Sequence, residues 1–182
     1  MTNVIWISIL LSQTLLKIIT MNAAHFHLLV NHFPVISTLI GFLVLIVGFF
    51  LNRSEVKQVA FGIFIFTALA TLPAFFSGEA AEEVLEQNPG FEEAYVEAHE
   101  EAALWGIISI ELLGIIAATA FYFTLKHNPL QKTLTLATFV FALLAIATIA
   151  RVNNTGGEIR HPEIRSVTTS ATQTESSGHD ND

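Results

Sequence analysis

The stretch from His25 to Leu51 reads HFHLLVNHFPVISTLIGFLVLIVGFFL and joins a group of histidines to a long apolar run. Pro34 has no backbone N–H and disfavours helical geometry in the residue before it, so it is tolerated best in the first turn of a helix. We therefore expect a helix that begins near residue 33 and continues to Leu51. At about 1.5 Å per residue, such a helix approaches the ~30 Å thickness of the hydrocarbon core of a bilayer. The sequence thus predicts a membrane span that begins beside the histidines.

The composition of the chain also indicates a membrane protein. Of its 182 residues, 52% are hydrophobic and only 13% are charged, which is too apolar for an ordinary soluble domain. There is no cysteine, which excludes disulfides, thiolate metal sites, iron–sulfur clusters and covalently attached c-type haem. The formal charge of −8 argues against nucleic acid as a partner. Any cofactor site must therefore be built from histidine, carboxylate or backbone groups.

Three more apolar runs predict three more spans, at about residues 59–76, 102–125 and 134–150. Pro73 lies near the end of the first of these runs and predicts a kink there. We expect an all-α membrane four-helix bundle formed by residues 23–160. A leader or extra apolar segment at 1–22 is expected before it, and a disordered polar tail at 161–182 after it.

The section between the second and third spans is strongly acidic. From Glu79 to Glu101 there are nine glutamates and no basic residue. The turn signal Asn88-Pro89-Gly90 divides this section, which predicts a hairpin of two short amphipathic helices. Nothing breaks the second of these helices before the third span, so we expect the two to be continuous.

Basic residues in the short loops predict the orientation of the chain. Arg53 and Lys57 lie between the first two spans, and Lys126 and Lys132 lie between the last two. These loops are expected in the cytoplasm. The histidines, the acidic hairpin and the C-terminal tail are then expected on the opposite side of the membrane.

Imidazole and carboxylate side chains from four separate segments are expected to meet at this opposite side, because the ends of bundled helices lie close together. Each of them alone could be a helix cap or part of a solvated surface, so the prediction of a ligand or cofactor site depends on the whole set. Gly156-Gly157 is expected to let the tail turn back and present Glu158. His25 lies furthest from the bundle and is the weakest candidate. The predicted site residues are His27, His32, Glu79, Glu82, His99, Glu100 and Glu158.

Glu111 lies inside the third span, three turns from Glu100 on the same helical face. A lone carboxylate near the middle of a bilayer is costly unless it is protonated or paired. One interpretation is a proton relay from the outer surface to the membrane centre. The other is a protonated carboxyl that bonds to a hydroxyl such as that of Ser37, Thr38 or Thr67.

Four short motifs suggest a family. In order, they are His27-Leu-Leu-Val-Asn-His32-Phe-Pro34, Ser77-Gly78-Glu79-Ala-Ala-Glu82, His99-Glu100-x-Ala102 and Gly156-Gly157-Glu158. Through them, residues 25–160 resemble the four-helix transmembrane domain-of-unknown-function family 2231, a family of small bacterial membrane proteins. Leu28 stands where we would expect a proline in that family. The resemblance implies a location in the bacterial inner membrane, an architecture like that of small b-type cytochromes, and redox chemistry.

Three functional hypotheses follow, and the sequence leaves all three open. The chain could be an electron-transfer subunit that binds haem b through His99 and either His27 or His32. It could instead hold zinc, iron, manganese or copper with these histidines and some of the glutamates. It could also be a structural or assembly subunit whose acidic face binds a soluble cytochrome or other subunits of a respiratory-type complex. We expect an electron-transfer or metal-binding subunit rather than a stand-alone enzyme.

Overall fold

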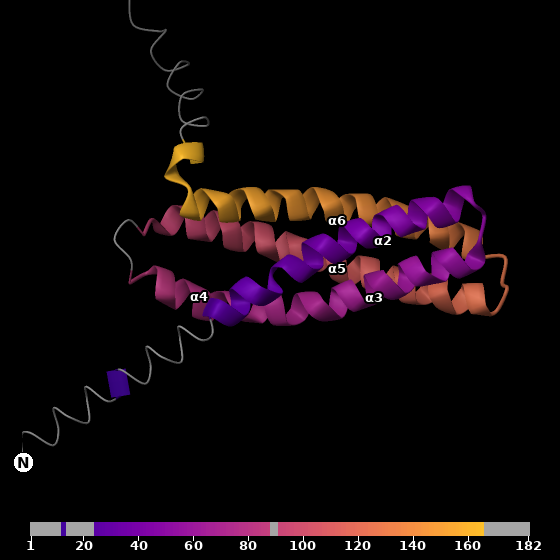
Figure 1. Ribbon diagram of the computed structural model, residues 1–182, viewed down its shortest axis with the longest axis horizontal. Helices are drawn as coiled ribbons and strands as arrows, with labels where there is room; N and C mark the ends of the chain where they lie inside the picture. The colour runs from indigo at the N-terminus through magenta and orange to yellow at the C-terminus, as the bar shows by residue number, and fades with distance from the viewer. Residues whose placement is uncertain (1–11, 14–23, 88–90, 166–182) are drawn as a thin grey trace, which may run out of the picture.

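The structure is a computed structural model that describes residues 12–13, 24–87 and 91–165 (Figure 1). A helical segment at 24–30 leads through a turn at Asn31 into the first long helix. The predicted turn at 88–90, most of the predicted leader and the tail beyond residue 165 lie outside the described residues. The helices are α2 (His32–Phe50), α3 (Ser54–Phe76), α4 (Gly78–Leu85), α5 (Glu93–Leu125) and α6 (Gln131–Arg160).

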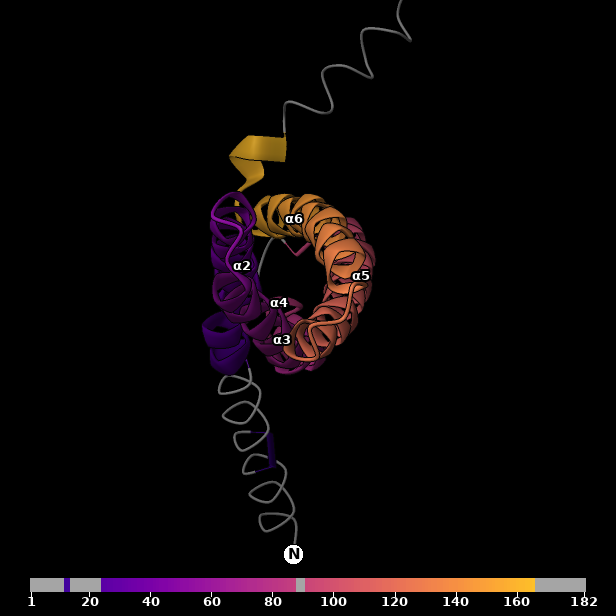
Figure 2. The ribbon, with the colours of Figure 1, turned by 90° about the vertical axis from the view of Figure 1, so that its right-hand side faces the viewer.

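The four long helices form the predicted four-helix bundle. Viewed along the bundle, α2, α3, α5 and α6 surround a central axis (Figure 2). α2 packs on α3, α3 on α5, and α5 on α6, while α2 and α6 close the ring with the least extensive contact of the four neighbouring pairs. The molecule therefore consists of two antiparallel hairpins, α2–α3 and α5–α6, joined through the acidic section.

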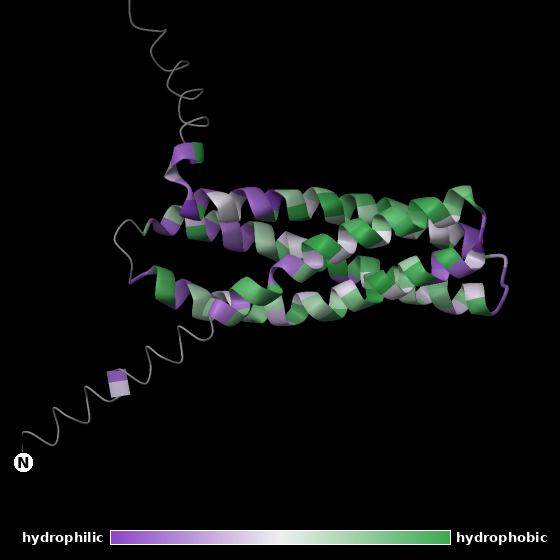
Figure 3. Cartoon of the chain, viewed as in Figure 1, coloured by the Kyte–Doolittle hydropathy of each residue, from purple (hydrophilic) through white to green (hydrophobic). Residues whose placement is uncertain are grey.

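The bundle has the dimensions and surface of a multi-pass membrane protein. Four helical stretches are long and apolar enough to cross a bilayer, namely Ala24–Phe50, Ser54–Leu85, Glu93–Leu125 and Gln131–Arg160. α5 has 33 residues and is about 50 Å long, well beyond the ~30 Å hydrocarbon core, so part of it extends past the core. Figure 3 shows that apolar residues cover most of the bundle and that hydrophilic residues gather at the end that carries α4.

Small residues allow the helices to approach closely in the core. A Cβ atom added to Gly114 would lie 2.5 Å from Cβ of Ala68, and one added to Gly41 would lie 2.8 Å from the Phe64 ring. Phe64 itself is fully buried. Close backbone approach of this kind is a common basis of helix association in membranes, where burial of apolar surface supplies little driving force.

The helix boundaries agree with the predictions at most positions. α2 begins at His32, with Pro34 in its first turn, and α5 runs without a break from the acidic section into the third span. The prediction for α6 is wrong at its C-terminal end. We expected the helix to end near residue 150 and the chain to turn back at Gly156-Gly157, but α6 continues through both glycines to Arg160. Residues 162–165, which we expected in the polar tail, form one more helical turn.

Candidate functional site

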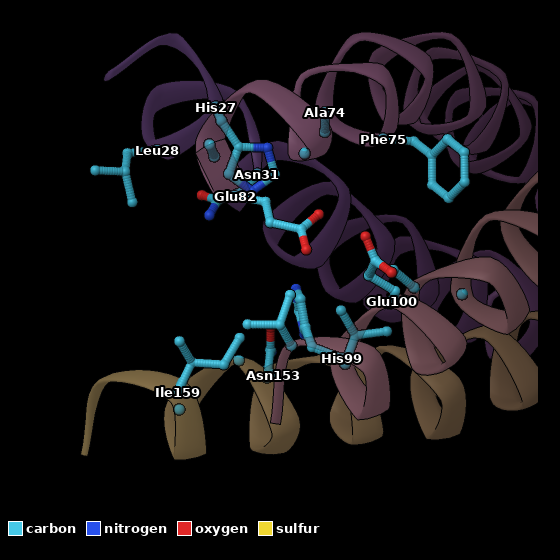
Figure 4. A pocket seen from close by; sticks show the side chains of 18 of the residues that line it. His27, Leu28, Asn31, Ala74, Phe75, Glu82, His99, Glu100, Asn153 and Ile159 are labelled. Carbon is cyan, nitrogen blue, oxygen red and sulfur yellow. The ribbon is translucent and has the colours of Figure 1, made fainter. Parts of the chain in front are cut away.

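The polar end of the bundle contains a cavity of about 1470 Å³ (Figure 4). Its walls come from the segment before and at the start of α2, the end of α3, α4, the first half of α5 and the end of α6. The end nearer the membrane core is apolar and includes Val35, Ile110 and Ile149. The predicted site residues that line the cavity are His27, His32, Glu79, Glu82, His99 and Glu100, whereas Glu158 is not among its lining residues.

His27 is oriented by a hydroxyl group at the end of α3. Its Nδ1 lies 3.0 Å from Oγ of Ser77, and this hydroxyl donates to the carbonyl of Ala74 at 3.1 Å. A hydroxyl has one proton, which here goes to the carbonyl, so its oxygen accepts from the Nδ1–H of the imidazole. The lone pair of neutral His27 is then on Nε2.

His99 has the same arrangement on the other hairpin. Its Nδ1 lies 3.1 Å from Oγ1 of Thr155, whose hydroxyl donates to the carbonyls of Arg151 and Val152. The lone pair of His99 is therefore also on Nε2. The ring lies against α6 because Gly156 has no side chain: a Cβ atom there would lie 3.1 Å from Cε1 of His99.

The likeness between the hairpins extends one step deeper into the bundle. A serine follows each histidine by ten residues, at Ser37 and Ser109. Ser37 accepts a hydrogen bond of 2.8 Å from Thr67 on α3, and Ser109 lies 2.6 Å from the hydroxyl of Thr148 on α6. The two hairpins thus share a repeated polar plan: a histidine held by a hydroxyl, and ten residues later a serine bonded to a threonine of the paired helix. The two histidines face each other across the cavity closely enough to interact electrostatically.

Two carboxyl groups meet in the same cavity. Glu82 on α4 and Glu100 on α5 lie close enough together to interact with each other. Figure 4 shows the two side chains reaching toward each other, with His99 close to them. Two carboxylates this close repel each other, and a proton or a cation between them would relieve the repulsion.

The other predicted residues are turned to different partners. His32 is exposed at the edge of the cavity, and its Nδ1 lies 3.1 Å from the carbonyl of Leu28, four residues earlier. Glu158 accepts a hydrogen bond of 2.9 Å from Asn154 on its own helix. Glu79 lines the cavity as an exposed side chain. Among the described residues, no three His, Asp or Glu side chains are close enough together to hold a metal ion.

Glu111 lacks the hydroxyl partner that one interpretation assigned to it. Its Oε1 is buried and has no hydrogen-bond partner within the described part of the chain. The hydroxyls proposed as partners donate elsewhere: Ser37 to the carbonyl of Phe33, Thr38 to that of Pro34, and Thr67 to Ser37 and Ile63. That interpretation is wrong for these three residues, and the proton relay stays a prediction.

Sequence reasoning missed the hydroxyls that orient the histidines. Ser77 and Thr155 each stand directly before a glycine, where an apolar helix gives way to a polar segment. This shared pattern was visible in the sequence, but nothing in it identified a histidine as the partner.

Sequence reasoning also missed the role of Arg165 at the mouth of the cavity. Its guanidinium lies 2.6 Å from the carboxylate of Glu92 and 4.0 Å from the centre of the Tyr95 ring. The same side chain donates to the carbonyls of Glu158 and Ile159, so it ties the end of α6 to the start of α5. Nearby, Glu163 accepts hydrogen bonds from its own backbone N–H and from His161, and both lower the pKa of its carboxyl group.

Comparison with protein-family models, curated proteins and solved structures gives no match for this chain. The family resemblance drawn from the four motifs therefore stays a prediction.

Proposed function

We propose that this membrane protein binds a transition-metal ion in the cavity and that the metal centre serves electron transfer. One observation carries the proposal: His27 and His99 come from different hairpins, each has Nδ1 held by a hydroxyl, and each keeps its Nε2 lone pair for a ligand. Metal-ligating histidines are typically fixed in this way through their other ring nitrogen. The bound metal would supply a one-electron redox couple.

The donor set fits a borderline divalent ion. His27 and His99 would provide two imidazole ligands, and Glu82 and Glu100 would provide carboxylates, a combination that suits iron, copper or zinc. Iron and copper would support electron transfer, whereas zinc has no redox chemistry. The two carboxyl groups contact each other in the structure. To bind the ion, both glutamate side chains would have to rotate away from each other and toward the two imidazoles, and their several rotatable bonds allow such rotation.

Haem b is the second candidate, and the size of the cavity favours it. About 1470 Å³ is far more than a single ion needs. Two imidazoles on opposing walls are the axial ligands that a b-type haem requires. The carboxyl pair favours the non-haem ion, because the axial positions of a haem have little use for carboxylates.

We also propose an orientation and a kind of partner. The α2–α3 and α5–α6 connections lie at the end of the bundle away from α4 (Figure 1). Arg53, Lys57, Lys126 and Lys132 lie in or beside these connections, which supports a cytoplasmic location for that end in a bacterial inner membrane. The cavity would then open outside the cytoplasm. Its exposed glutamates would attract a basic soluble cytochrome or a basic subunit of a respiratory-type complex.

An absorbance spectrum and elemental analysis of the purified protein test the proposal. A near-stoichiometric amount of iron or copper without a Soret band is the expected result, and a Soret band that shifts on reduction would select haem b instead. Either signal should disappear in His27→Ala and in His99→Ala and persist in His127→Ala, which alters a histidine at the opposite end of the bundle. Protein that contains neither metal nor haem after expression with both in excess would refute the proposal.

A further inference from the structure

The cavity continues toward the lipid along the seam between α2 and α6. A second cavity of about 110 Å³ lies in this seam and shares Val35, Ile149 and Asn153 with the large one. Leu39 and Ala150 also line it, and both are exposed on the outer surface of the bundle. Among the four long helices, α2 and α6 pack less extensively than the other neighbouring pairs, so the seam is the least tightly packed boundary between two spans.

The position of the seam gives it access to the bilayer. Leu39 and Ala150 belong to the apolar parts of the helical stretches Ala24–Phe50 and Gln131–Arg160, which are long and apolar enough to span a membrane. A molecule dissolved in the membrane could therefore enter sideways through the seam and reach His27 and His99 without passing through water.

The charge of the cavity restricts the headgroup of such a molecule. Glu79, Glu82, Glu97 and Glu100 line the large cavity, whereas one of its two arginines, Arg165, is already paired with Glu92. A phosphate or carboxylate headgroup would be repelled by these glutamates. A neutral headgroup with hydroxyl donors would find carboxylate and imidazole acceptors.

We propose that the cavity and the seam together bind a neutral, hydroxyl-bearing membrane lipid of the hydroquinone class. The ring would lie in the cavity between His27 and the carboxyl pair, and the alkyl or isoprenoid tail would lie in the seam between α2 and α6. The choice of a redox-active ring rests on the proposed electron-transfer function, while the lateral route rests on the seam alone.

Photoaffinity labelling in phosphatidylcholine nanodiscs tests this inference. A photoreactive decyl-hydroquinone should label α2 and α6 around residues 35–39 and 146–153, and unlabelled decyl-hydroquinone should compete. The same ring without its tail should compete about tenfold less well or worse, a loss of about 1.4 kcal/mol. Ala150→Phe, which fills the seam, should reduce the competed labelling by a similar factor. Ala147→Phe is the matched control, because Ala147 is exposed on the same helix but lines neither cavity.

Three outcomes would overturn the inference: labelling that decyl-hydroquinone does not compete, equal labelling of the two phenylalanine variants, or a bound phospholipid that Ala150→Phe releases and hydroquinone does not. If Ala150→Phe does not fold, the test is decided by whether competition in the unmodified protein depends on the tail of the hydroquinone.

Metal and haem analysis of the same samples separates the two proposals. Competed seam labelling in protein without metal or haem would support the ligand site and refute the metal site, and loaded protein without competed labelling would do the reverse.

Discussion

A single hydroxyl group fixes the tautomer and the ring orientation of each of the two cavity histidines, His27 and His99. The hydroxyls of Ser77 and Thr155 each donate a hydrogen bond to a backbone carbonyl. Each hydroxyl oxygen accepts a hydrogen bond from the Nδ1–H of an imidazole. The tautomer of His27 and His99 therefore depends on groups outside the cavity. His32 shows the contrast, because its ring bonds to the carbonyl of Leu28, four residues earlier in the chain.

Removing the hydroxyl of Thr155 should weaken metal binding without removing a ligand. Valine has the same shape as threonine and cannot accept the Nδ1–H, so we expect Thr155→Val to lower metal affinity by about 10–100-fold. Competition with a chelator measures this change. Thr155→Ser should restore the affinity, and Thr119→Val, on an exposed threonine that bonds only to its own helix, should have no effect. Unchanged affinity in Thr155→Val would show that the hydroxyl does not orient a ligand.

The carboxyl pair gives a test that separates the two cofactor candidates. If Glu82 binds the ion, Glu82→Gln should lower metal content, whereas Glu83→Gln, on an exposed neighbour, should leave it unchanged. If the cofactor is haem b, Glu82→Gln should leave the Soret band in place.

Metal affinity should also fall as the pH falls, because the imidazoles and the carboxyl pair take up protons when no ion is bound. An affinity that rises on acidification would contradict the assigned ligands.

Among the helices, α6 shows how tertiary packing overrides a local signal. Gly156-Gly157 is a typical end of a helix, yet α6 continues through it, with Gly156 against the ring of His99 and Val152 against Gly106. The spans were predictable because each is a long apolar run. The end of α6 was not, because the contacts that hold it involve residues of α5 that are distant in the sequence.

The two glycines of α6 should respond differently to the same substitution. Alanine at either position gains about 1 kcal/mol in helix propensity. At Gly156 the added Cβ would lie 3.1 Å from the His99 ring, whereas at Gly157 it would lie 3.4 Å from the flexible end of Ile164. We expect Gly156→Ala to displace His99 and to reduce cofactor content, and Gly157→Ala to keep it. Equal cofactor content in the two variants would mean that the ring position does not matter for binding.

A second glycine pair tests the packing of the bundle. Gly114→Ala should destabilise the protein by about 1–3 kcal/mol, because the new methyl group would overlap with Ala68 on α3. Gly62 is the control, since a Cβ atom there would meet nothing within 4 Å. Thermal unfolding in detergent should show a lower midpoint for Gly114→Ala and an equal or higher one for Gly62→Ala.

In the molecule as a whole, it was predictable that four helix ends would meet. It was not predictable which of the histidines and glutamates at these ends would point into the cavity. A four-helix bundle must bring these ends together, so His27, Glu82, His99 and Glu100 were all among the candidates. The sequence did not distinguish His27 from His32, because only the packing of residues 24–30 against the end of α3 brings His27, and not His32, to Ser77. Glu158 was expected in the site only because α6 was expected to end before it.

Arg165 should control how firmly the two ends of the α5–α6 hairpin are joined. Arg165→Ala removes the bond to Glu92 and the contact with the Tyr95 ring, so amide hydrogen exchange should become faster at residues 158–165 and at the start of α5. Exchange in α3 should not change. Arg160→Ala, on an exposed residue at the end of α6, is the control, and faster exchange in both variants would argue against a specific role for Arg165.

The repeated polar plan places one imidazole on each half of the chain. A ligand held by both imidazoles would cross-link the halves from within, in addition to the helix packing between α3 and α5. If residues 1–87 and 91–182 were produced as separate polypeptides, loaded fragments should remain associated in detergent at dilutions where cofactor-free fragments separate. The cavity would then hold the two helical hairpins together.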